Sequence, residues 1–499
     1  MSTRRIRALL GDRYLWLGLA LVACASLRAT TGAWIGDFWS HGAAVREIAE
    51  RPSGPRHPEI AADLPGVFYT PYTVAVAWLA RIGHLSPVTA LAIAGICNLV
   101  LLLIGLRRYA RALFRRPELV SFYAIVLVLF LWGPSPWLWS GFFHFQAVPF
   151  VLPYPSTFAT GLLLLSLAWH VQWLKATRSG SVWMLCASGA VLVLMHPVTA
   201  LVYAIGLVAQ TVGSGRERSW GAKSSAIVAV GMVSVIAAAA WPYYPLFDAM
   251  AERGEYHEAN AAMYVDVLRH VWPCLVAIPF LVLRLRANRR DPLGWMFIGL
   301  ASLYVYGGLT GHFAYGRLIS HAVMILHLIL AAWLARIEWS DIERRVLSTT
   351  RACAIAAIVS VFALGVALGA PHLRDTVLRH PDWAGMYSFL GTYVGQDDVV
   401  LSDLESAYPV PAFAGKVVAH VGNMTLVPDA AARARDVGHF FSNEATHTER
   451  TDIIRKYNVK WLLLNQEHAA SASIQQAFDA TRAVHVDEWW VLMRLDRGD

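Results

Sequence analysis

The chain has 499 residues, of which 57% are hydrophobic and only 15% are charged. This composition excludes an ordinary soluble protein and predicts a polytopic membrane protein with room for a folded domain outside the bilayer. The five cysteines all lie in or at the ends of apolar runs, so we expect packing residues there and no disulfide framework.

The first apolar run opens a series of predicted membrane helices. It contains "LVAC" (residues 21–24), which is similar to a lipoprotein cleavage box, but cleavage there would remove half of the span. We therefore interpret the run as an uncleaved anchor. Eleven apolar segments are candidate membrane-spanning helices, because each approaches the length that a bilayer requires. They are 14–34, 88–106, 119–134, 156–174, 181–195, 197–213, 224–243, 270–285, 292–309, 317–335 and 352–370.

Lysine and arginine are concentrated in every second connection between these segments. The basic connections are 107–116, 175–178, 216–223, 284–290 and 336–351. Since cytoplasmic loops carry an excess of these residues, we expect all five connections on the cytoplasmic side. The pattern predicts a multi-pass protein of the bacterial inner (plasma) membrane, with a cytoplasmic N-terminus and an extracytoplasmic C-terminus.

Residues 35–87 form the first predicted outer loop. Its segment "VFYTPYTVAVAWLARIGHL" (67–85) is apolar, but counting it as a span would move every later basic connection outside. We therefore expect an amphipathic or re-entrant helix there, after an amphipathic helix at 40–50. Farther along, "MHPVTA" (195–200) breaks an apolar run, which predicts two short helices that meet at the outer surface.

Hydropathy falls sharply after residue 370. In the remaining residues we expect strands at 398–402, 416–421, 459–465 and 488–496, and helices at 446–457 and 473–481. This order predicts a soluble, extracytoplasmic α/β domain over 371–499, separate from an α-helical membrane domain over 1–370. The segment has no GxGxxG, GKS/T or HExxH motif, so a binding or covering role is favoured over chemistry.

The stretch "GDFWSH" (36–41) directly follows the first predicted span. Asp37 lies there among aromatic residues, and a carboxylate partly shielded from water suits a general base. An ordinary interfacial acid is the alternative. His41 follows one helical turn later and is a candidate binding residue, whereas the charges of Arg46 and Glu50 are expected to face water.

Aromatic and histidine residues mark other parts of the outer face. Tyr69 and Tyr72 are candidate binding residues, although an aromatic belt at the membrane interface would also account for them. The uncharged segment 135–156 has four aromatic rings before His144 and could clasp a lipid tail or stack on a sugar. His144 and His196 are lone histidines, for which structural roles stay open.

The acidic outer loop 247–260 could hold an acceptor hydroxyl through Glu255 or His257, and a plain solvated helix is an equal alternative. Arg317 lies at the outer end of a span, where a guanidinium is costly unless it meets an anion such as a lipid-linked phosphate. Snorkelling of Arg317 to headgroups would also explain it, and Tyr315 beside it is a further candidate. No metal-ligand spacing is present, so we expect no metal or other cofactor, and no nucleic-acid partner.

Together these features resemble the GT-C superfamily of integral-membrane glycosyltransferases, over nearly the whole chain. The likeness rests on "GDFWSH" followed by "FYTPY", on the helices around "MHP" with the late "YGRL", and on the tail segments "VVLSDLESAYPVPAFAGKVV" and "ERTDIIRKYNVKWLLLN".

The resemblance implies an inverting transfer from a polyprenyl-phosphate sugar donor to an extracytoplasmic glycan or glycolipid acceptor, next to membrane lipids. It implies that Asp37 is the general base and that Arg317 binds the donor phosphate. Tyr69, His144 and His196 would be secondary members of the pocket. Because Asp37 is followed by Phe38 and Trp39 rather than by a second acid, a monophosphate donor without a metal is favoured.

Two other classes of membrane protein fit the hydropathy. A transporter or flippase would be expected to bury acids or broken helices at mid-membrane and to show repeated halves, and the sequence has neither. A lipid-linked polysaccharide polymerase or ligase would have its main functional loop late, whereas this chain has its acidic loop first.

Overall fold

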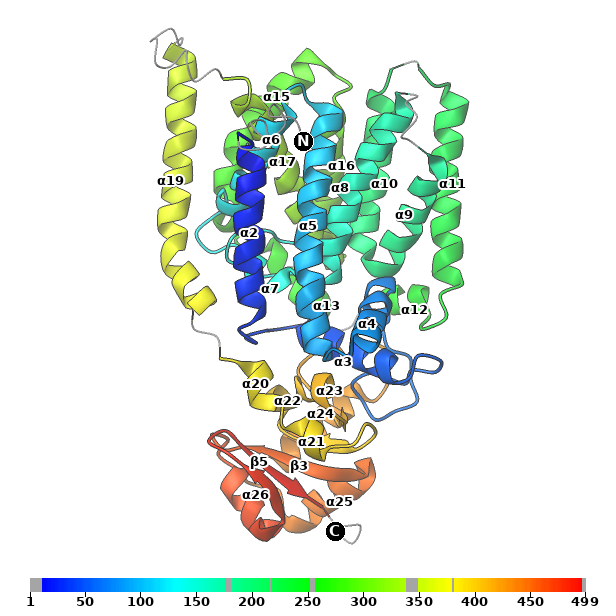
Figure 1. Ribbon diagram of the computed structural model, residues 1–499, viewed down its shortest axis with the longest axis vertical. Helices are drawn as coiled ribbons and strands as arrows, with labels where there is room; N and C mark the ends of the chain where they lie inside the picture. The colour runs from blue at the N-terminus through cyan, green and yellow to red at the C-terminus, as the bar shows by residue number, and fades with distance from the viewer. Residues whose placement is uncertain are drawn as a thin grey trace. The chain divides into compact units, whose positions relative to one another are not determined.

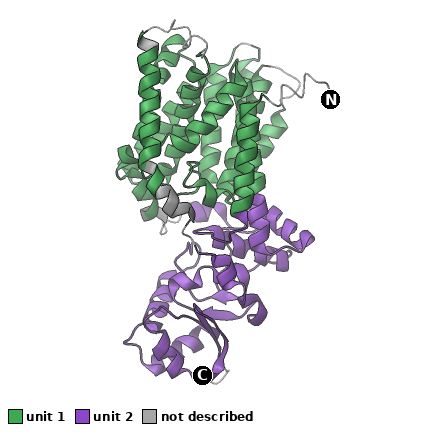
Figure 2. Ribbon diagram, turned by 60° about the vertical axis from the view of Figure 1, so that its left-hand side comes forward, with its two compact units in different colours: residues 1–28, 95–241, 253–380 green, residues 29–94, 242–252, 381–499 purple. Residues whose placement is uncertain are grey.

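The computed structural model describes residues 11–175, 181–215, 217–251, 256–337, 349–378 and 381–495. The chain divides into two compact units, shown in Figure 2: unit 1 comprises residues 1–28, 95–241 and 253–380, and unit 2 comprises 29–94, 242–252 and 381–499. Unit 2 therefore combines the first outer loop with the C-terminal residues, which the hydropathy pattern assigns to separate domains.

The regular secondary structure in the described residues of unit 1 is all helical, and its long helices run side by side (Figure 1). The α-helices are α2 (Arg13–Ala29), α5 (Pro87–Leu113), α6 (Pro117–Phe130), α7 (Val148–Val151), α8 (Pro155–Leu174), α9 (Val182–Met195), α10 (Pro197–Gly213), α11 (Trp220–Ala239), α13 (Tyr256–Ala261), α14 (Val267–Val271), α15 (Ile278–Ala287), α16 (Pro292–Thr310), α17 (Leu318–Leu334) and α19 (Thr349–Leu378). The 3₁₀ helices are η1 (Ala262–Tyr264), η2 (Trp272–Ala277) and η3 (Phe313–Arg317).

Each of the eleven predicted apolar segments coincides with helical structure. Among the described residues, six helices are long and apolar enough to cross a membrane: Pro87–Leu113, Pro155–Leu174, Trp220–Ala239, Val267–Ala287, Pro292–Thr310 and Phe313–Leu334. Pro117–Phe130, Val182–Met195, Pro197–Gly213 and Ala352–Leu368 are shorter apolar helices. These helices indicate a multi-pass membrane protein, and the count of eleven spans stays a prediction.

The helices of unit 1 differ in how much of their surface the protein covers. In its most apolar window, Phe313–Leu334 is 83% buried, whereas Trp220–Ala239 is only 22% buried. The first contains α17, which packs against α6 and α16, and the second is α11, which packs mainly against α9. Helix α17 is therefore central in unit 1, and α11 presents a wide apolar surface suited to lipid.

The described residues of the basic connections, and the helix ends beside them, contact one another at one end of unit 1. Arg116 donates to the carbonyl of Ala335 at 3.3 Å, and Lys175 donates to the carbonyl of Ala112 at 2.9 Å. Arg218 likewise donates to the carbonyl of Trp173, while Gly213 packs directly against Arg290 and Pro292. These contacts join the connections to one another, as a common side of the membrane requires. Which side that is stays a prediction.

Unit 2 is a mixed α/β unit. Its α-helices are α3 (Phe38–Glu50), α4 (Pro71–Gly83), α12 (Leu246–Ala251), α20 (Trp383–Tyr387), α21 (Leu390–Tyr393), α22 (Leu404–Ala407), α23 (Val410–Phe413), α24 (Ala430–Phe440), α25 (His447–Tyr457) and α26 (Ser471–Ala477). The strands are β1 (Val399–Leu401), β2 (Lys416–Val417), β3 (Val459–Asn465), β4 (Ala483–Val486) and β5 (Trp490–Arg494), with η4 (Ala480–Arg482) before β4.

The five strands form one sheet in the order β2-β1-β3-β5-β4, parallel on the β1 side and antiparallel around β5. The expected strands in 398–402, 416–421, 459–465 and 488–496 are confirmed, and so are the expected helices in 446–457 and 473–481. Thr446 and Glu449 form a capping box that fixes the start of α25. Strand β4 and helix α24 were not expected. The fold class, a polytopic α-helical protein with a C-terminal α/β domain, is confirmed.

The first outer loop joins this sheet through one short segment. The amide of Val417 in β2 donates to the carbonyl of Glu59 at 2.8 Å, and Ile60 pairs with Val417 as an isolated parallel bridge. Ile60 is 1% exposed and belongs to the same apolar core as the strands. The loop therefore completes the sheet edge, which explains why residues 29–94 group with the tail.

Candidate functional site

Helix α3 is almost completely covered by protein, with every residue from Phe38 to Ile48 buried. It packs against α23, and Gly42 is so close to Ala412 that an added Cβ would lie 2.9 Å from the alanine Cβ. The expectation that Arg46 faces water is therefore wrong, because its side chain is 4% exposed, whereas that of Glu50 is 39% exposed. A helix with charged side chains can still be buried when another segment of the chain supplies hydrogen-bond and ion-pair partners for those side chains.

Lys416 supplies those partners. Its Nζ donates to Glu47 Oε2 at 2.6 Å and to the carbonyls of His57 and Pro58 at 2.7 and 3.1 Å, which accounts for all three ammonium protons. Burial lowers the pKa of Lys416 to about 8, and the charge of Glu47 opposes that shift. Arg46 also donates to the carbonyl of Gly415. Strand β2 and the glycine before it are thus joined to α3 by a buried ion pair and a buried hydrogen bond.

Asp37 lies at the start of α3, where its half-buried carboxylate makes no capping bond to the helix. The rings of Trp34 and Phe38, close to Asp37 in the sequence, stack on each other with their centroids 4.6 Å apart. Tyr408 Oη donates to Asp37 Oδ1 at 3.4 Å, and Ser40 Oγ donates to the same hydroxyl at 3.2 Å. The carboxylate is therefore oriented by a tyrosine from the C-terminal residues.

A second carboxyl group lies in the same cluster. Glu59 is 1% exposed. Burial raises the pKa of Glu59 to about 8, and the negative charge of Asp37 reinforces this shift. His420 Nε2 is 3.5 Å from Glu59 Oε1, and the His420 ring stacks on Tyr408 at 5.1 Å. Burial also lowers the pKa of His420 to about 3, so burial favours the neutral form of both groups.

The other candidates in unit 2 are packed side chains. His41 is 8% exposed with its ring edge-on to Phe68, and burial lowers the pKa of His41 to about 3. Tyr69 is 1% exposed; its hydroxyl donates to the carbonyl of Arg56, and its ring lies 5.8 Å from that of Tyr243. Tyr72 is 6% exposed. These three residues are packed in the protein interior around α3 and α4.

The remaining described candidates belong to unit 1. Arg317 ends η3, and its guanidinium lies over the Trp139 ring, 5.5 Å from the centroid, with Tyr315 two residues earlier in the same turn. His196 caps α10: its Nδ1 accepts from the Thr199 amide at 3.3 Å, so it has a structural task at the break between α9 and α10. Glu255 and the side chain of His257 lie outside the described residues.

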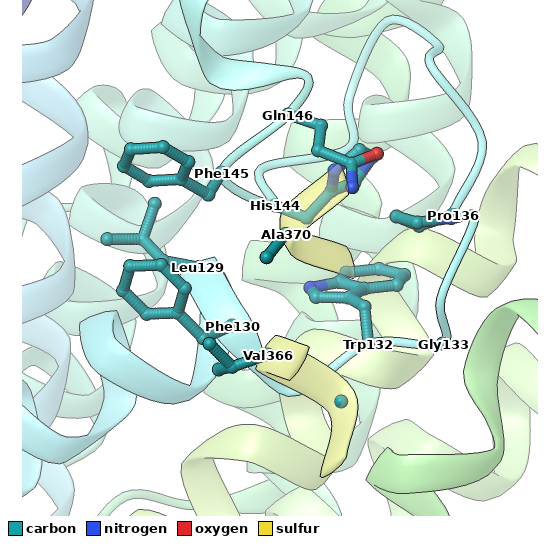
Figure 3. Close-up of a pocket in the computed structure, with 11 residues that line it drawn as sticks. Leu129, Phe130, Trp132, Gly133, Pro136, His144, Phe145, Gln146, Val366 and Ala370 are labelled. Atoms are coloured by element: carbon teal, nitrogen blue, oxygen red, sulfur yellow. The ribbon is translucent and has the colours of Figure 1, made fainter. Parts of the chain in front are cut away.

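His144 borders a small apolar cavity of about 80 Å³, shown in Figure 3. Its Nε2 is 2.9 Å from the carbonyl of Trp137. Rings and aliphatic groups from α6, the 131–147 segment and α19 enclose the cavity, with Gln146 as the other polar side chain. Leu129, Phe130, Trp132, Phe145, Val366 and Ala370 are among the lining residues. The cavity suits hydrocarbon better than a polar ligand.

In the part of the chain that the structure describes, no group of three or more His, Cys, Asp or Glu side chains is arranged to hold a metal ion.

Sequence reasoning missed Tyr408, Lys416 and His420 as partners of the first outer loop, and it left Glu59 without a role. A signal was present, because "SAYPVPAFAGKVVAH" (406–420) places these three polar residues within an otherwise apolar stretch.

Comparison with solved structures finds membrane enzymes of the same fold. ArnT from Cupriavidus metallidurans bound to undecaprenyl phosphate is 14% identical, with 97% of this chain and 98% of ArnT aligned and a TM-score of 0.56. The archaeal oligosaccharyltransferase AglB from Archaeoglobus fulgidus, in complex with an inhibitory peptide and a dolichol-phosphate, is 10% identical, with 90% of this chain and 69% of AglB aligned and a TM-score of 0.56. No protein-family model and no curated protein matches the sequence.

Proposed function

We propose that this chain, which has the fold of the GT-C membrane glycosyltransferases, moves a sugar from a polyprenyl-phosphate donor to an extracytoplasmic glycan or lipid-linked acceptor. Two solved proteins with this fold were captured with lipid phosphates, undecaprenyl phosphate in ArnT and dolichol-phosphate in AglB. That shared chemistry supports a lipid-linked donor. The sugar would be a hexose or a pentose.

The observation that carries the proposal is the setting of Asp37. Its carboxylate is half-buried and accepts a hydrogen bond from Tyr408, while burial favours the neutral form of the neighbouring Glu59. Of the two carboxyl groups in this cluster, Glu59 is buried and favours its protonated form, so the half-buried Asp37 is the better candidate to accept a proton. In this role Asp37 takes the proton of the acceptor hydroxyl as its oxygen attacks the anomeric carbon.

The donor then loses its lipid phosphate. The bond between the anomeric carbon and the phosphate oxygen breaks, its electron pair leaves with the phosphate, and the configuration inverts. We assign Arg317 to the growing negative charge on that phosphate, because a fixed guanidinium matches phosphate oxygens. Its position over Trp139 holds the guanidinium by a cation–π contact. The apolar cavity beside His144 is assigned to a prenyl segment of the donor.

We further propose that the protein resides in the bacterial inner membrane with the N-terminus and the five basic connections in the cytoplasm. The gathering of those connections at one end of unit 1 supports this orientation. Asp37 would then face the extracytoplasmic side. Labelling by an impermeant reagent from outside tests it, with a cysteine introduced at the exposed Arg435 of α24 in a variant whose five native cysteines are replaced by serine. Labelling only from the cytoplasm contradicts it.

The proposed reaction is tested by sugar transfer in membranes supplied with a panel of polyprenyl-phosphate sugars. We expect Asp37→Asn to lower the transfer rate by at least about 100-fold, since the acceptor loses its base. Glu50→Gln, on the same helix but 39% exposed, is the matched control and should keep its rate. Full activity of Asp37→Asn would remove the assignment of the base. Donor translocation without any glycosyl transfer by the unmodified protein would instead indicate a flippase.

A further inference from the structure

Unit 1 contains a second, larger cavity at the end where the basic connections gather. Its volume is about 340 Å³, and it lies among the last turns of α15 and α17 and the connection before α16. Arg284, Asn288, Asp291 and Arg336 form its polar part. The proposed glycosyl transfer uses none of these residues, so the cavity needs a separate explanation.

The polar part of this cavity has a net positive charge, and one of its arginines is held in a fixed position. Arg284 Nε and Nη2 donate to the two carboxylate oxygens of Asp291 at 3.3 and 2.5 Å, which fixes the guanidinium. Asp291 in turn accepts from the Gly294 amide at 3.0 Å as the cap of α16. Asp291 offsets the charge of Arg284, so Arg336 gives the lining side chains their net positive charge. The other three arginines of "RLRANRRD" (284–291) lie nearby in the sequence but do not line the cavity. A net positive lining favours an anion.

The other part of the cavity is apolar. Phe280 and Trp333 pack with ring centroids 4.4 Å apart, and Leu283 and Ile329 line the same space. Leu283 is 56% exposed, and the candidate span Val267–Ala287 is only 28% buried within the protein. This helix therefore presents its apolar surface to lipid, directly beside the arginines.

We infer that this cavity binds an anionic phospholipid, with the phosphate at Arg284 and Arg336 and the start of an acyl chain along Phe280, Leu283 and Trp333. A ligand with both an anionic headgroup and a hydrocarbon chain satisfies both parts of the lining at once. Basic pockets between helices at a membrane surface recognise such headgroups. The inference does not depend on the proposed transfer reaction.

The test uses the full chain, purified in mild detergent, and native mass spectrometry with phosphatidylglycerol and with phosphatidylcholine of the same acyl chains. We expect phosphatidylglycerol to be retained in preference to phosphatidylcholine. Arg336→Gln should weaken phosphatidylglycerol binding by about fivefold, the effect of one arginine near a lipid headgroup. Arg286→Gln is the matched control, because Arg286 is exposed on the same helix but does not line the cavity.

Arg284→Gln provides a second variant, and Arg336→Gln carries the test if loss of the Arg284–Asp291 pair prevents folding. Equal phosphatidylglycerol binding by Arg336→Gln and the unmodified protein overturns the inference. So does an equal loss in Arg286→Gln, which would indicate attraction by the basic surface as a whole. Displacement of phosphatidylglycerol by millimolar inorganic phosphate would assign the cavity to a free phosphate instead.

Discussion

Helices α3 and α4 are neighbours in the first outer loop and have the same length of 13 residues, yet they meet opposite surroundings. In α3 even Arg46 and Glu47 are buried, at 3% and 0% exposure. In α4 the large apolar residues Trp78 and Ile82 are exposed, at 46% and 75%. Helix α3 is an internal element of unit 2 that holds the candidate base, whereas α4 offers an apolar surface suited to a membrane interface.

The difference between these helices shows that amphipathic character alone does not determine whether a helix lies at the protein surface. Helix α3 carries several charged residues and has partners for them in and beside β2, above all Lys416. The described part of α4 carries a single charged residue, Arg81, which donates to the carbonyl of Ala49. The buried charges therefore occur in α3, the helix next to the candidate base, where they help to hold it in a fixed position.

The largest expected effect comes from breaking the buried charge pair. Lys416→Met leaves Glu47 buried without its ammonium partner, so we expect a loss of about 3 kcal/mol in the free energy of unfolding. The matched variant is Lys460→Met, whose partner Asp398 lies in an exposed pair with the lysine 53% exposed, and it should lose less than about 1 kcal/mol. Thermal unfolding of the full chain in detergent measures both. Equal shifts would show that α3 is not fastened by this pair.

A matched pair of isoleucines compares the two helices directly. Ile48 in α3 is 2% exposed, and Ile82 in α4 is 75% exposed. Ile48→Ala should therefore cost about 2–4 kcal/mol in stability because it opens a cavity, while Ile82→Ala should stay within about 0.5 kcal/mol in detergent. Melting temperatures of the two variants decide the matter, and a larger drop for Ile82→Ala would reverse the comparison.

The pH dependence of stability probes Glu59. Its pKa in the folded state, about 8, is raised above the ordinary value of 4.5, so between these pH values the folded protein binds more protons than the unfolded chain. Stability is therefore lost as pH rises through this window. Glu59→Gln removes that loss, and we expect its stability relative to the unmodified protein to improve by about 1–3 kcal/mol from pH 5 to pH 8.

Melting curves at both pH values give this difference, because other titrating groups contribute equally to the two proteins. Glu405→Gln, an exposed acid at the start of α22, should show no such change. If the two variants respond alike, Glu59 ionises in the folded protein as an exposed carboxyl does, and the contrast between Asp37 and Glu59 is lost.

Much of the fold could be predicted from the sequence, because long apolar segments and strand-like runs are local signals. Strand β3 has the predicted bounds, and α25 begins at the predicted Thr446 cap. The environment of α3 could not be predicted, because its partners lie more than 360 residues away in the chain, as in the bond from Lys416 to Glu47. Asp37 itself could be proposed from its place after an apolar run, but the tyrosine that orients it depends on tertiary packing.

The smallest effect is expected for Tyr408, which reaches Asp37 from the C-terminal residues. Tyr408→Phe removes one donor at 3.4 Å from Oδ1 and keeps the ring stacked on His420. One hydrogen bond contributes about 1 kcal/mol, so we expect about a fivefold loss in the transfer rate with little change in melting temperature. Since the ionised form of Asp37 loses a donor, the acidic limb of the pH–rate profile should move to higher pH.

Tyr393→Phe is the control for the Tyr408 variant, because Tyr393 is 39% exposed in α21 and none of the Asp37 contacts described involves it. A tyrosine that only packs would change the rate, if at all, without moving the acidic limb. An unmoved limb in Tyr408→Phe would thus make Tyr408 a packing residue. A moved limb would mean that the C-terminal residues help set the proton affinity of the candidate base. The burial of α3 would then serve to hold Asp37, the residue that precedes it, in a fixed orientation.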